Sequence, residues 1–220
     1  MKFSGINLLD ELGKSELAEL RAAFHERSFV KDHIIYTPEA EDDLVFVISK
    51  GRVRIYLAYG DKEFTLAILN PGDLYATHAD CYIQAFDDTT LLLAGVKEVK
   101  TVMARVPLFT RTMVRVLGHI LRNSFSIIGD LAFKDIRDRL LSYILVEADT
   151  HGTKLEDGGV ELRFDLTIEQ LSLLMGATRQ TVSTLLNNLE RDGLIKKTGR
   201  GRYCIPDMDE LSRQADKNAA

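Results

Sequence analysis

The chain contains no apolar run long enough to cross a membrane, although 45% of its 220 residues are hydrophobic. Its first residues also lack the charged-then-apolar pattern of a secretory signal. We therefore expect a cytoplasmic protein that does not associate with membranes. Only four prolines are present, and no segment is of low complexity, which leaves little room for disorder. The polar tail Asp209–Ala220 is the part that we expect to fray.

Cysteine is equally scarce. Cys81 and Cys204 do not have the spacing of a metal or redox motif, and nothing in their positions calls for a disulfide. Two distant cysteines also exclude an iron–sulfur cluster, because such a cluster is bound by several thiolates. The chain has no paired carboxylates, nucleophile–base motif or phosphate-binding loop that would indicate an enzyme.

The segment Thr167–Ile195 has the pattern of a helix-turn-helix. Thr167 and Gln170 have the spacing of a capping box, which satisfies free backbone donors at a helix start. Apolar residues then recur at helical spacing, and Gly176 interrupts the helix, as the tight turn between two crossing helices requires. Thr178 can cap a second helix. The predicted buried face of that helix contains Val182, Leu185, Leu186 and Leu189.

The other face of the second helix suggests DNA binding. It begins with hydrogen-bonding side chains of the kind that read base edges in the major groove, namely Arg179, Gln180, Ser183 and Thr184. Two amphipathic helices joined through a glycine also occur in proteins that never bind DNA. Charge favours DNA here, since six Lys or Arg residues face two acidic residues over 176–204 in a chain of net charge −5.

A basic segment follows the second predicted helix. Residues Lys196–Tyr203 have the pattern of a short β-hairpin, which could serve as a wing lying on DNA phosphates. We expect the phosphate contacts to come from Lys196, Lys197 and Arg200.

The first half of the chain reads differently. Leu8–Ala23 is predicted to form a short amphipathic helix. Between His25 and Val96, turn signals at 59–62 and 70–73 separate short β-rich runs, which indicates an antiparallel barrel or roll and not βαβ units. The predicted strands are Leu44–Ile48, Arg52–Tyr59, Phe64–Leu69, Tyr82–Ala85 and Thr90–Leu93.

Pro107 is predicted to open a long helix that ends near Leu131. A mostly apolar row of its residues follows the 3-4-3-4-3 spacing of a coiled-coil seam, at Val114, Leu117, Leu121, Ser124, Ile128 and Leu131. A second apolar stripe contains Met113, Val116, Ile120 and Ile127. Both stripes could belong to the core of a monomer, but the long register favours one stripe on the roll and the other on a second subunit. A hinge at 132–134, a helix at Asp135–Asp149 and a strand near Val160–Phe164 then lead to the helix-turn-helix.

This order of elements resembles the cyclic-AMP-receptor/FNR family of transcription regulators over nearly the whole chain. The resemblance implies an α+β fold with an N-terminal antiparallel β-roll of the cyclic-nucleotide-binding type, a long dimerisation helix and a C-terminal winged helix-turn-helix. It implies a sensor domain at 1–132, a DNA-binding domain at 133–220, a homodimer on a palindromic operator, and contact with RNA polymerase. The markers are Lys50-Gly51-Arg52-Val53, Asn70-Pro71-Gly72-Asp73 and Arg179-Gln180-Thr181-Val182.

Cyclic AMP would be the default effector in this family, but the segment Gly72–Ala85 argues against it. The family's pocket needs a Gly-Glu turn and an Arg-Ser pair, and the segment contains neither. A cyclic phosphate carries a full negative charge, and burying it without a cationic partner is costly. We therefore do not expect cyclic AMP to bind.

The same segment contains His78. A lone histidine is more often a surface or hydrogen-bonded residue than a ligand, although an imidazole can bind haem iron. Its surroundings resemble the CooA-type members of the superfamily, which are haem-containing, carbon-monoxide-sensing activators. The segments that carry this resemblance are Arg52–Leu69, Gly72–His78, Met113–Gly118 and Arg179–Thr184.

The CooA-type resemblance implies haem b in each subunit, with His78 as one axial ligand. The opposite ligand would be the α-amino group of Met1 from the other subunit. Carbon monoxide would displace this amine and shift the dimer to a DNA-competent state. Relatives can carry a cysteine two residues before the ligand histidine, but Ala76 occupies that position here, so a thiolate ligand is not available there.

The resemblance also implies an apolar pocket for the bound gas, formed near Met113, Val114, Leu117, Gly118 and Leu121. Plain dimer packing explains the same apolar residues, and both roles can hold together. The alternative is a haem-free regulator of the same family that senses another small effector, or none.

Overall fold

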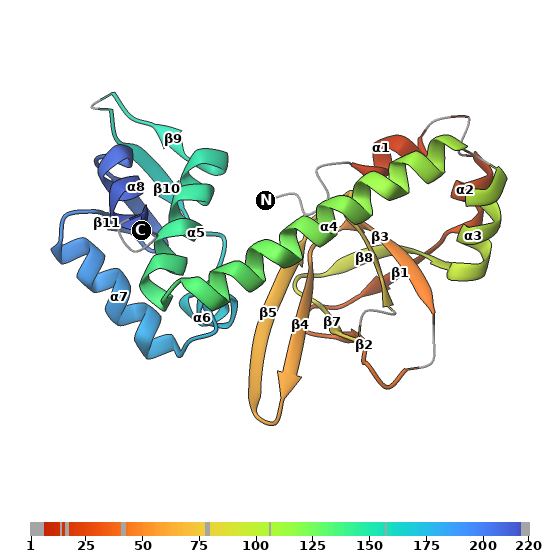
Figure 1. Cartoon of the computed structure of the whole chain (residues 1–220), viewed down its shortest axis with the longest axis horizontal. Coiled ribbons are helices and arrows are strands. Elements are labelled where there is room, and N and C mark those ends of the chain that lie inside the picture. Colours follow the sequence, from red (N-terminus) through yellow and green to blue (C-terminus); the bar gives the residue numbers. More distant parts are fainter. Residues whose placement is uncertain are drawn as a thin grey trace. The chain divides into compact units, whose positions relative to one another are not determined.

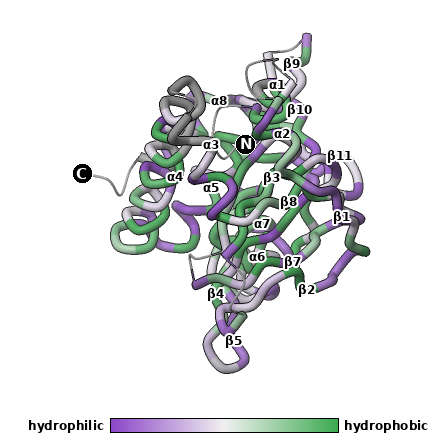
Figure 2. Tube along the Cα trace, turned by 90° about the vertical axis from the view of Figure 1, so that its right-hand side faces the viewer, coloured by the Kyte–Doolittle hydropathy of each residue, from purple (hydrophilic) through white to green (hydrophobic). Residues whose placement is uncertain are grey.

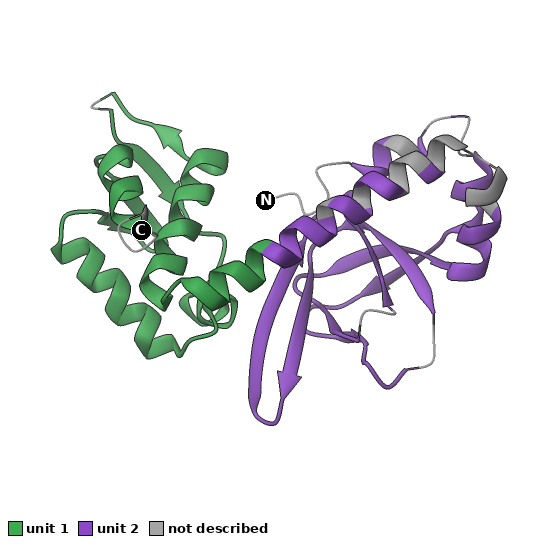
Figure 3. Cartoon of the chain, viewed as in Figure 1, with its two compact units in different colours: residues 1, 126–220 green, residues 2–125 purple. Residues whose placement is uncertain are grey.

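The computed structural model describes residues 7–13, 15, 18–40, 43–77, 80–105, 107–156 and 158–216. Within its helices, the side chains at 11, 102–105, 107–109, 111–113, 116, 119 and 216 are also left undescribed. The chain forms two compact units that divide between residues 125 and 126, as Figure 3 shows. We call them the sensor unit and the reader unit and describe each by itself.

The sensor unit contains two antiparallel four-stranded sheets, with strand orders β1-β8-β3-β6 and β2-β7-β4-β5 (Figure 1). This confirms the predicted roll. The strands are β1 (His25–Phe29), β2 (Ile34–Tyr36), β3 (Leu44–Lys50), β4 (Val53–Tyr59), β5 (Lys62–Leu69), β6 (Leu74–Ala76), β7 (Tyr82–Ala85) and β8 (Thr89–Gly95).

Strand β3 shows how the layers of the sensor unit are held together. Phe46 and Ile48 point into the core between the two sheets. Val45 and Val47, which alternate with them, pack against α1 (Leu8–Leu12), α2 (Ala18–Ala23) and α3 (Val96–Arg105). Because successive side chains of a strand point to opposite faces, a strand buried on both sides reads as the continuous apolar run seen here.

The N-terminal helix departs from the sequence prediction. A single helix over Leu8–Ala23 was expected, but the structure contains two separate helices, α1 and α2. The backbone N–H of Gly13 donates to the Leu9 carbonyl at the end of α1, and glycine is a poor residue for continuing a helix. The short helix α3 was not predicted at all.

Helix α4 (Pro107–Phe133) is 27 residues long and ends two residues beyond the predicted position. Its exposed stripe follows the predicted seam except at Ser124, whose hydroxyl donates to the Ile120 carbonyl. Phe125 is exposed instead. The side chains of this stripe are 44–63% exposed, and Figure 2 shows hydrophobic residues recurring along the helix. They are Val114, Leu117, Leu121, Phe125, Ile128 and Leu131.

The second predicted stripe of α4 is confirmed at Ile120, which packs against the apolar cluster beneath the helices of the sensor unit. The side chains of Met113 and Val116 lie outside the described residues. Ile127 is half-buried.

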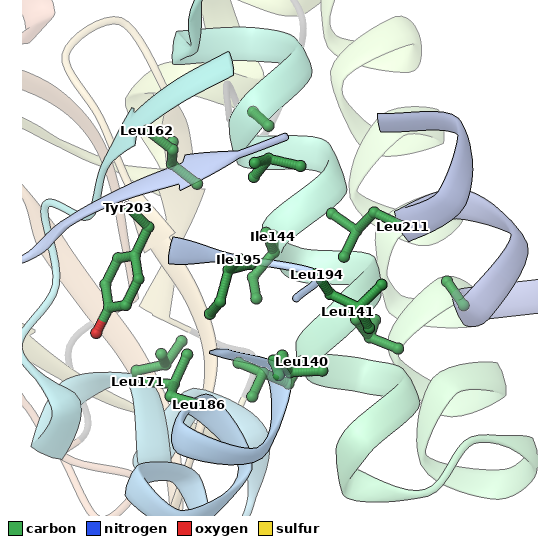
Figure 4. Close-up of a cluster of buried hydrophobic side chains, with 14 of the residues drawn as sticks. Leu140, Leu141, Ile144, Leu162, Leu171, Leu186, Leu194, Ile195, Tyr203 and Leu211 are labelled. Atoms are coloured by element: carbon green, nitrogen blue, oxygen red, sulfur yellow. The ribbon is translucent and has the colours of Figure 1, made fainter. Parts of the chain in front are cut away.

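The reader unit surrounds one apolar core, to which its helices and its sheet of order β11-β12-β10-β9 contribute (Figure 4). Leu140, Ile144, Leu162, Leu171 and Leu211 are among the residues that meet there. The elements are α5 (Ile136–His151), β9 (Thr153–Lys154), β10 (Val160–Arg163), α6 (Ile168–Met175), α7 (Arg179–Arg191), β11 (Lys196–Gly199), β12 (Arg202–Ile205) and α8 (Met208–Asp216).

The predicted helix-turn-helix caps are present. The Thr167 hydroxyl accepts from the Gln170 N–H, and the Gln170 side chain accepts from the Thr167 N–H, which completes the capping box. Gly176 ends α6 at φ 64°, a left-handed conformation that glycine adopts without strain. Thr178 caps α7. The expected buried face of α7 is buried at Val182, Leu186 and Leu189, and Leu185 is partly buried.

The expectation of a fraying tail from Asp209 onward is wrong for the residues described. Helix α8 extends to Asp216, and its Leu211 and Ala215 lie in the reader core, with Met208 packed against them. These three apolar residues recur at helical spacing, so a mostly polar segment still covers the core with one face.

Two glycine substitutions test the packing around the turns of the sensor unit. Gly51 has φ +76°, and a Cβ there would collide with the Asp88 carbonyl and the Thr89 hydroxyl, whereas Gly60 has φ +61° with nothing within 4 Å. We expect Gly60→Ala to cost about 1 kcal/mol from backbone strain alone, and Gly51→Ala on the order of 3 kcal/mol from strain plus collision. Denaturant unfolding measures both, and equal losses would contradict the collision.

Candidate nucleic-acid interface and sensor site

The exposed face of α7 holds the predicted base-reading residues. Arg179, Gln180 and Thr184 are exposed and Ser183 is half-buried. Thr178 and Thr181 pair their hydroxyls at 2.8 Å, which leaves the amide of Gln180 as the largest neutral hydrogen-bonding group on this surface. A shallow depression along it is lined by Thr178, Gln180, Thr181, Thr184 and Leu185.

The Arg179 guanidinium remains available for a ligand. Its Nε lies 4.0 Å from Glu169 Oε2, and the two side chains are 72% and 64% exposed. An ion pair this long and this exposed is screened by water and contributes little. The Arg179 side chain can therefore turn toward an anionic partner at small cost.

The predicted wing is the β11–β12 hairpin. Lys196, Lys197 and Arg200 are all exposed on it. The Lys197 N–H donates to Glu190 Oε1 at 3.1 Å, so the hairpin backbone is bonded to the last turn of α7. The structure thereby makes the second helix and the wing parts of one surface.

Two further basic residues were not singled out from the sequence. Arg163 of β10 lies directly opposite Arg202 of β12, and both are exposed. Like charges at directly opposed positions repel, which favours an anion between them. The sequence showed both arginines, but only the strand register brings them to one face.

The predicted haem ligands His78 and Met1 lie outside the described residues. The chain is fixed on both sides of His78. Before it, the buried Thr77 accepts from the Leu44 N–H through Oγ1 at 2.9 Å, and after it Cys81 is buried in the roll. Thr77 and Cys81, which lie on either side of His78 in the chain, are thus both buried in the sensor unit.

Cys81 does not suit the role of an iron ligand. Burial raises the pKa of its thiol, and the thiolate is the form that binds metals. Burial also raises the pKa of Tyr75, with Cys81 as its hydrogen-bonding neighbour. Both side chains therefore stay neutral near pH 7, in agreement with a structural role.

The predicted gas-pocket residues form an open helix face in the part of the chain that is described. Val114, Leu117 and Leu121 are exposed on α4, and Gly118 has no atom within 4 Å of the place where a Cβ would stand. The side chain of Met113 lies outside the described residues. A flat apolar group or a second helix could cover this face, and the bare Gly118 allows close approach.

The described residues contain no group of three His, Cys, Asp or Glu side chains that could hold a metal ion. Haem does not need one, because the porphyrin supplies four ligands and the protein only the axial ones. Of the helices that the structure describes, none has both the length and the hydrophobicity to cross a bilayer.

Similarity to known proteins extends over both units of this chain. Residues 138–214 match the Crp-like helix-turn-helix domain, a range that runs from α5 to α8. A CooA variant from Carboxydothermus hydrogenoformans is 39% identical, with 95% of each chain covered and a TM-score of 0.88. The chain belongs to the cyclic-AMP-receptor/FNR family of transcription regulators.

Two other relatives show the range of the family. The reduced, Fe(II) carbon-monoxide-sensing protein from R. rubrum is 29% identical, with 94% of this chain and 98% of that chain covered and a TM-score of 0.55. A CRP-like, cAMP-activated global transcriptional regulator from Mycobacterium tuberculosis is 28% identical over an alignment of 214 positions, which covers 91% of this chain and 92% of that protein.

Substitutions on α7 and on the wing should change DNA binding in different ways. We expect Gln180→Ala to relax preference at one base pair by roughly 1–3 kcal/mol, because it removes a base-edge contact. Lys197→Ala should weaken binding to all DNA sequences alike and reduce the salt dependence of binding, because it removes a phosphate contact. Titration of duplexes selected from a random pool, and of their single-base variants, measures both.

Lys154→Ala is the matched control. Lys154 is an exposed lysine on β9, the opposite edge of the same sheet from β11, so its loss changes net charge by the same amount away from the wing. Equal losses for Gln180→Ala and Lys197→Ala across all base variants would argue against the assigned roles.

Proposed function

We propose that this protein is a homodimeric, haem-dependent transcription activator that binds DNA in response to carbon monoxide. The observation that carries the proposal is likeness over both units. The CO-dependent transcription factor CooA from Carboxydothermus hydrogenoformans in its imidazole-bound form is 40% identical, with 98% of each chain covered and a TM-score of 0.54. The cAMP-activated relative named above is less similar, at 28% identity.

In this proposal the groups that would hold the haem are His78 and the α-amino group of Met1 from the second subunit. Haem, when bound, supplies an iron that takes up carbon monoxide. Thr77 and Cys81, on either side of His78 in the chain, are both fixed in the roll. The apolar face at Val114, Leu117 and Leu121 would exclude water from the gas.

The start of α1 limits how much of the N-terminal segment can be released. The Leu8 N–H donates to the Gly72 carbonyl at 2.9 Å, and Asn7 occupies the space that a side chain at position 72 would fill. Asn7 is thus anchored on the turn that leads to His78. The residues before it could span at most about 20 Å when extended, so displacement of the amine would free a short arm and leave α1 in place.

The exposed stripe of α4 supports the dimer. A row of large apolar side chains along one helix face is unfavourable in water, and pairing with the same face of a second copy covers it. A two-fold protein presents two α7 helices, so it would read a palindromic operator. As an activator it would also contact RNA polymerase.

The second candidate is a haem-free regulator of the same family that responds to another effector. The names of cAMP-related relatives favour cyclic AMP for that role, but the cation that is buried in the described part of the roll, Arg54, is already paired. Arg54 is buried there, yet its guanidinium donates to Thr65 and Glu63 and stacks on Tyr56. A cyclic phosphate buried beside Arg54 would therefore have to share this cation with the Glu63 carboxylate, which is costly.

The colour of the purified protein tests the proposal. We expect a Soret band that shifts when carbon monoxide is added to the reduced protein, and a rise in operator affinity with carbon monoxide but not with cyclic AMP. His78→Ala should change the ferrous spectrum, because it removes an axial ligand. His33→Ala is the control, since His33 is exposed in the same unit and stacks only on Phe29.

A colourless protein that also resists reconstitution with haem would refute haem sensing and leave the haem-free regulator. An unchanged ferrous spectrum in His78→Ala would refute only the assignment of His78 as a haem ligand.

A further inference from the structure

One arginine joins the end of α4 to the helix-turn-helix inside the reader unit. Arg139 Nη1 donates to the Lys134 carbonyl and Nη2 donates to the Met175 carbonyl, each at 3.0 Å. Lys134 is the first residue after α4, and Met175 is the last residue of α6, directly before the Gly176 turn. We call this pair of bonds the brace.

The brace is chemically specific to arginine. The last carbonyls of a helix lack partners within the helix and carry partial negative charge. A planar guanidinium can donate to two such carbonyls at once, whereas a lysine ammonium is a point donor on a flexible stem. In the described structure the Arg139 Nε is buried without a hydrogen-bond partner. A buried donor without a partner costs free energy, and the two hydrogen bonds to carbonyls offset this cost.

The junction between α4 and α5 is held at other points as well. Lys134 Nζ lies 2.9 Å from Asp130 Oδ1 and donates to Ser142 Oγ at 3.0 Å. Asp135 caps α5 by accepting from the Asp138 N–H. Lys134, the last residue of the segment where the sequence suggested a hinge, is therefore well bonded, and the brace adds a hydrogen-bonded link from this junction to α6.

We propose that Arg139 is a positioning residue that fixes the recognition helix α7, through α6, to the end of the dimer helix α4. With the brace intact, α7 and the end of α4 stay fixed to each other within the reader unit, which helps the two α7 helices of a dimer to keep the spacing that a palindromic operator needs. This inference rests on the proposed dimeric reading of DNA. It does not rest on haem.

If the brace has this role, its removal should reduce DNA affinity by an amount that depends on the number of half-sites in the duplex. When two binding modules are held at the right spacing, the second binding event is favoured by a high effective concentration, which flexible attachment reduces. Arg139→Gln should therefore weaken binding to a duplex with two half-sites by about tenfold, and binding to a single half-site by less than about twofold. Arg139→Lys, with a single donor group, should fall between Arg139→Gln and the wild type.

The experiment uses the full-length protein and duplexes selected from a random pool, one with both half-sites and one with a single half-site. Arg137→Gln is the matched control. It removes the same charge from the same helix, and the structure gives Arg137 no hydrogen bond or ion pair to another described residue. Arg137→Gln should keep the wild-type ratio of the two affinities.

Two results would overturn the brace. The first is a ratio of the two affinities in Arg139→Gln equal to that of the wild type, which includes an equal loss of affinity on both duplexes. If Arg139→Gln fails to fold, as a thermal melt would show, Arg139→Lys decides, and a wild-type ratio there is the second. A wild-type protein with no preference for two half-sites would refute the dimeric reading together with the brace. Missing haem or carbon-monoxide binding would leave the test unaffected.

Discussion

The amphipathic balance of α4 is the constraint on which the rest of the molecule depends. The helix is apolar on more than one face, and its own roll covers only the face that contains Ile120. The exposed stripe from Val114 to Leu131 has no cover among the described residues. In the proposed dimer a second copy would cover this face, and the two-fold symmetry that follows would pair the two reader units.

The sequence was most informative where local chemistry decides local structure. The capping box at Thr167 and the left-handed Gly176 depend on neighbours a few residues away, and both were predictable. The roll followed from turn signals between β-rich runs. The short strands β1, β2 and β6 escaped prediction, because their burial depends on pairing with distant strands. Helix α8 escaped because its polar composition concealed three apolar residues on one face.

The candidate sites show the same contrast between features set by local sequence and features set by distant residues. The exposed row on α7 could be predicted from helical periodicity, since each side chain's direction follows from its position in the helix. The opposition of Arg163 and Arg202 depends on strand register, and the bond from Arg139 to the Met175 carbonyl joins residues 36 positions apart. Neither leaves a periodic trace in the sequence. His78 and Met1 remain predictions that rest on resemblance to CooA-type proteins.

The placement of the two thiols has a practical consequence. Cys81 is buried with a raised pKa, while Cys204 is half-buried on β12, opposite Lys196 of the wing. Alkylating reagents attack exposed thiolates, so at neutral pH they should discriminate between the two positions. A fluorophore or spin label introduced at Cys204 would report on the wing itself, in the native sequence and without any engineered cysteine.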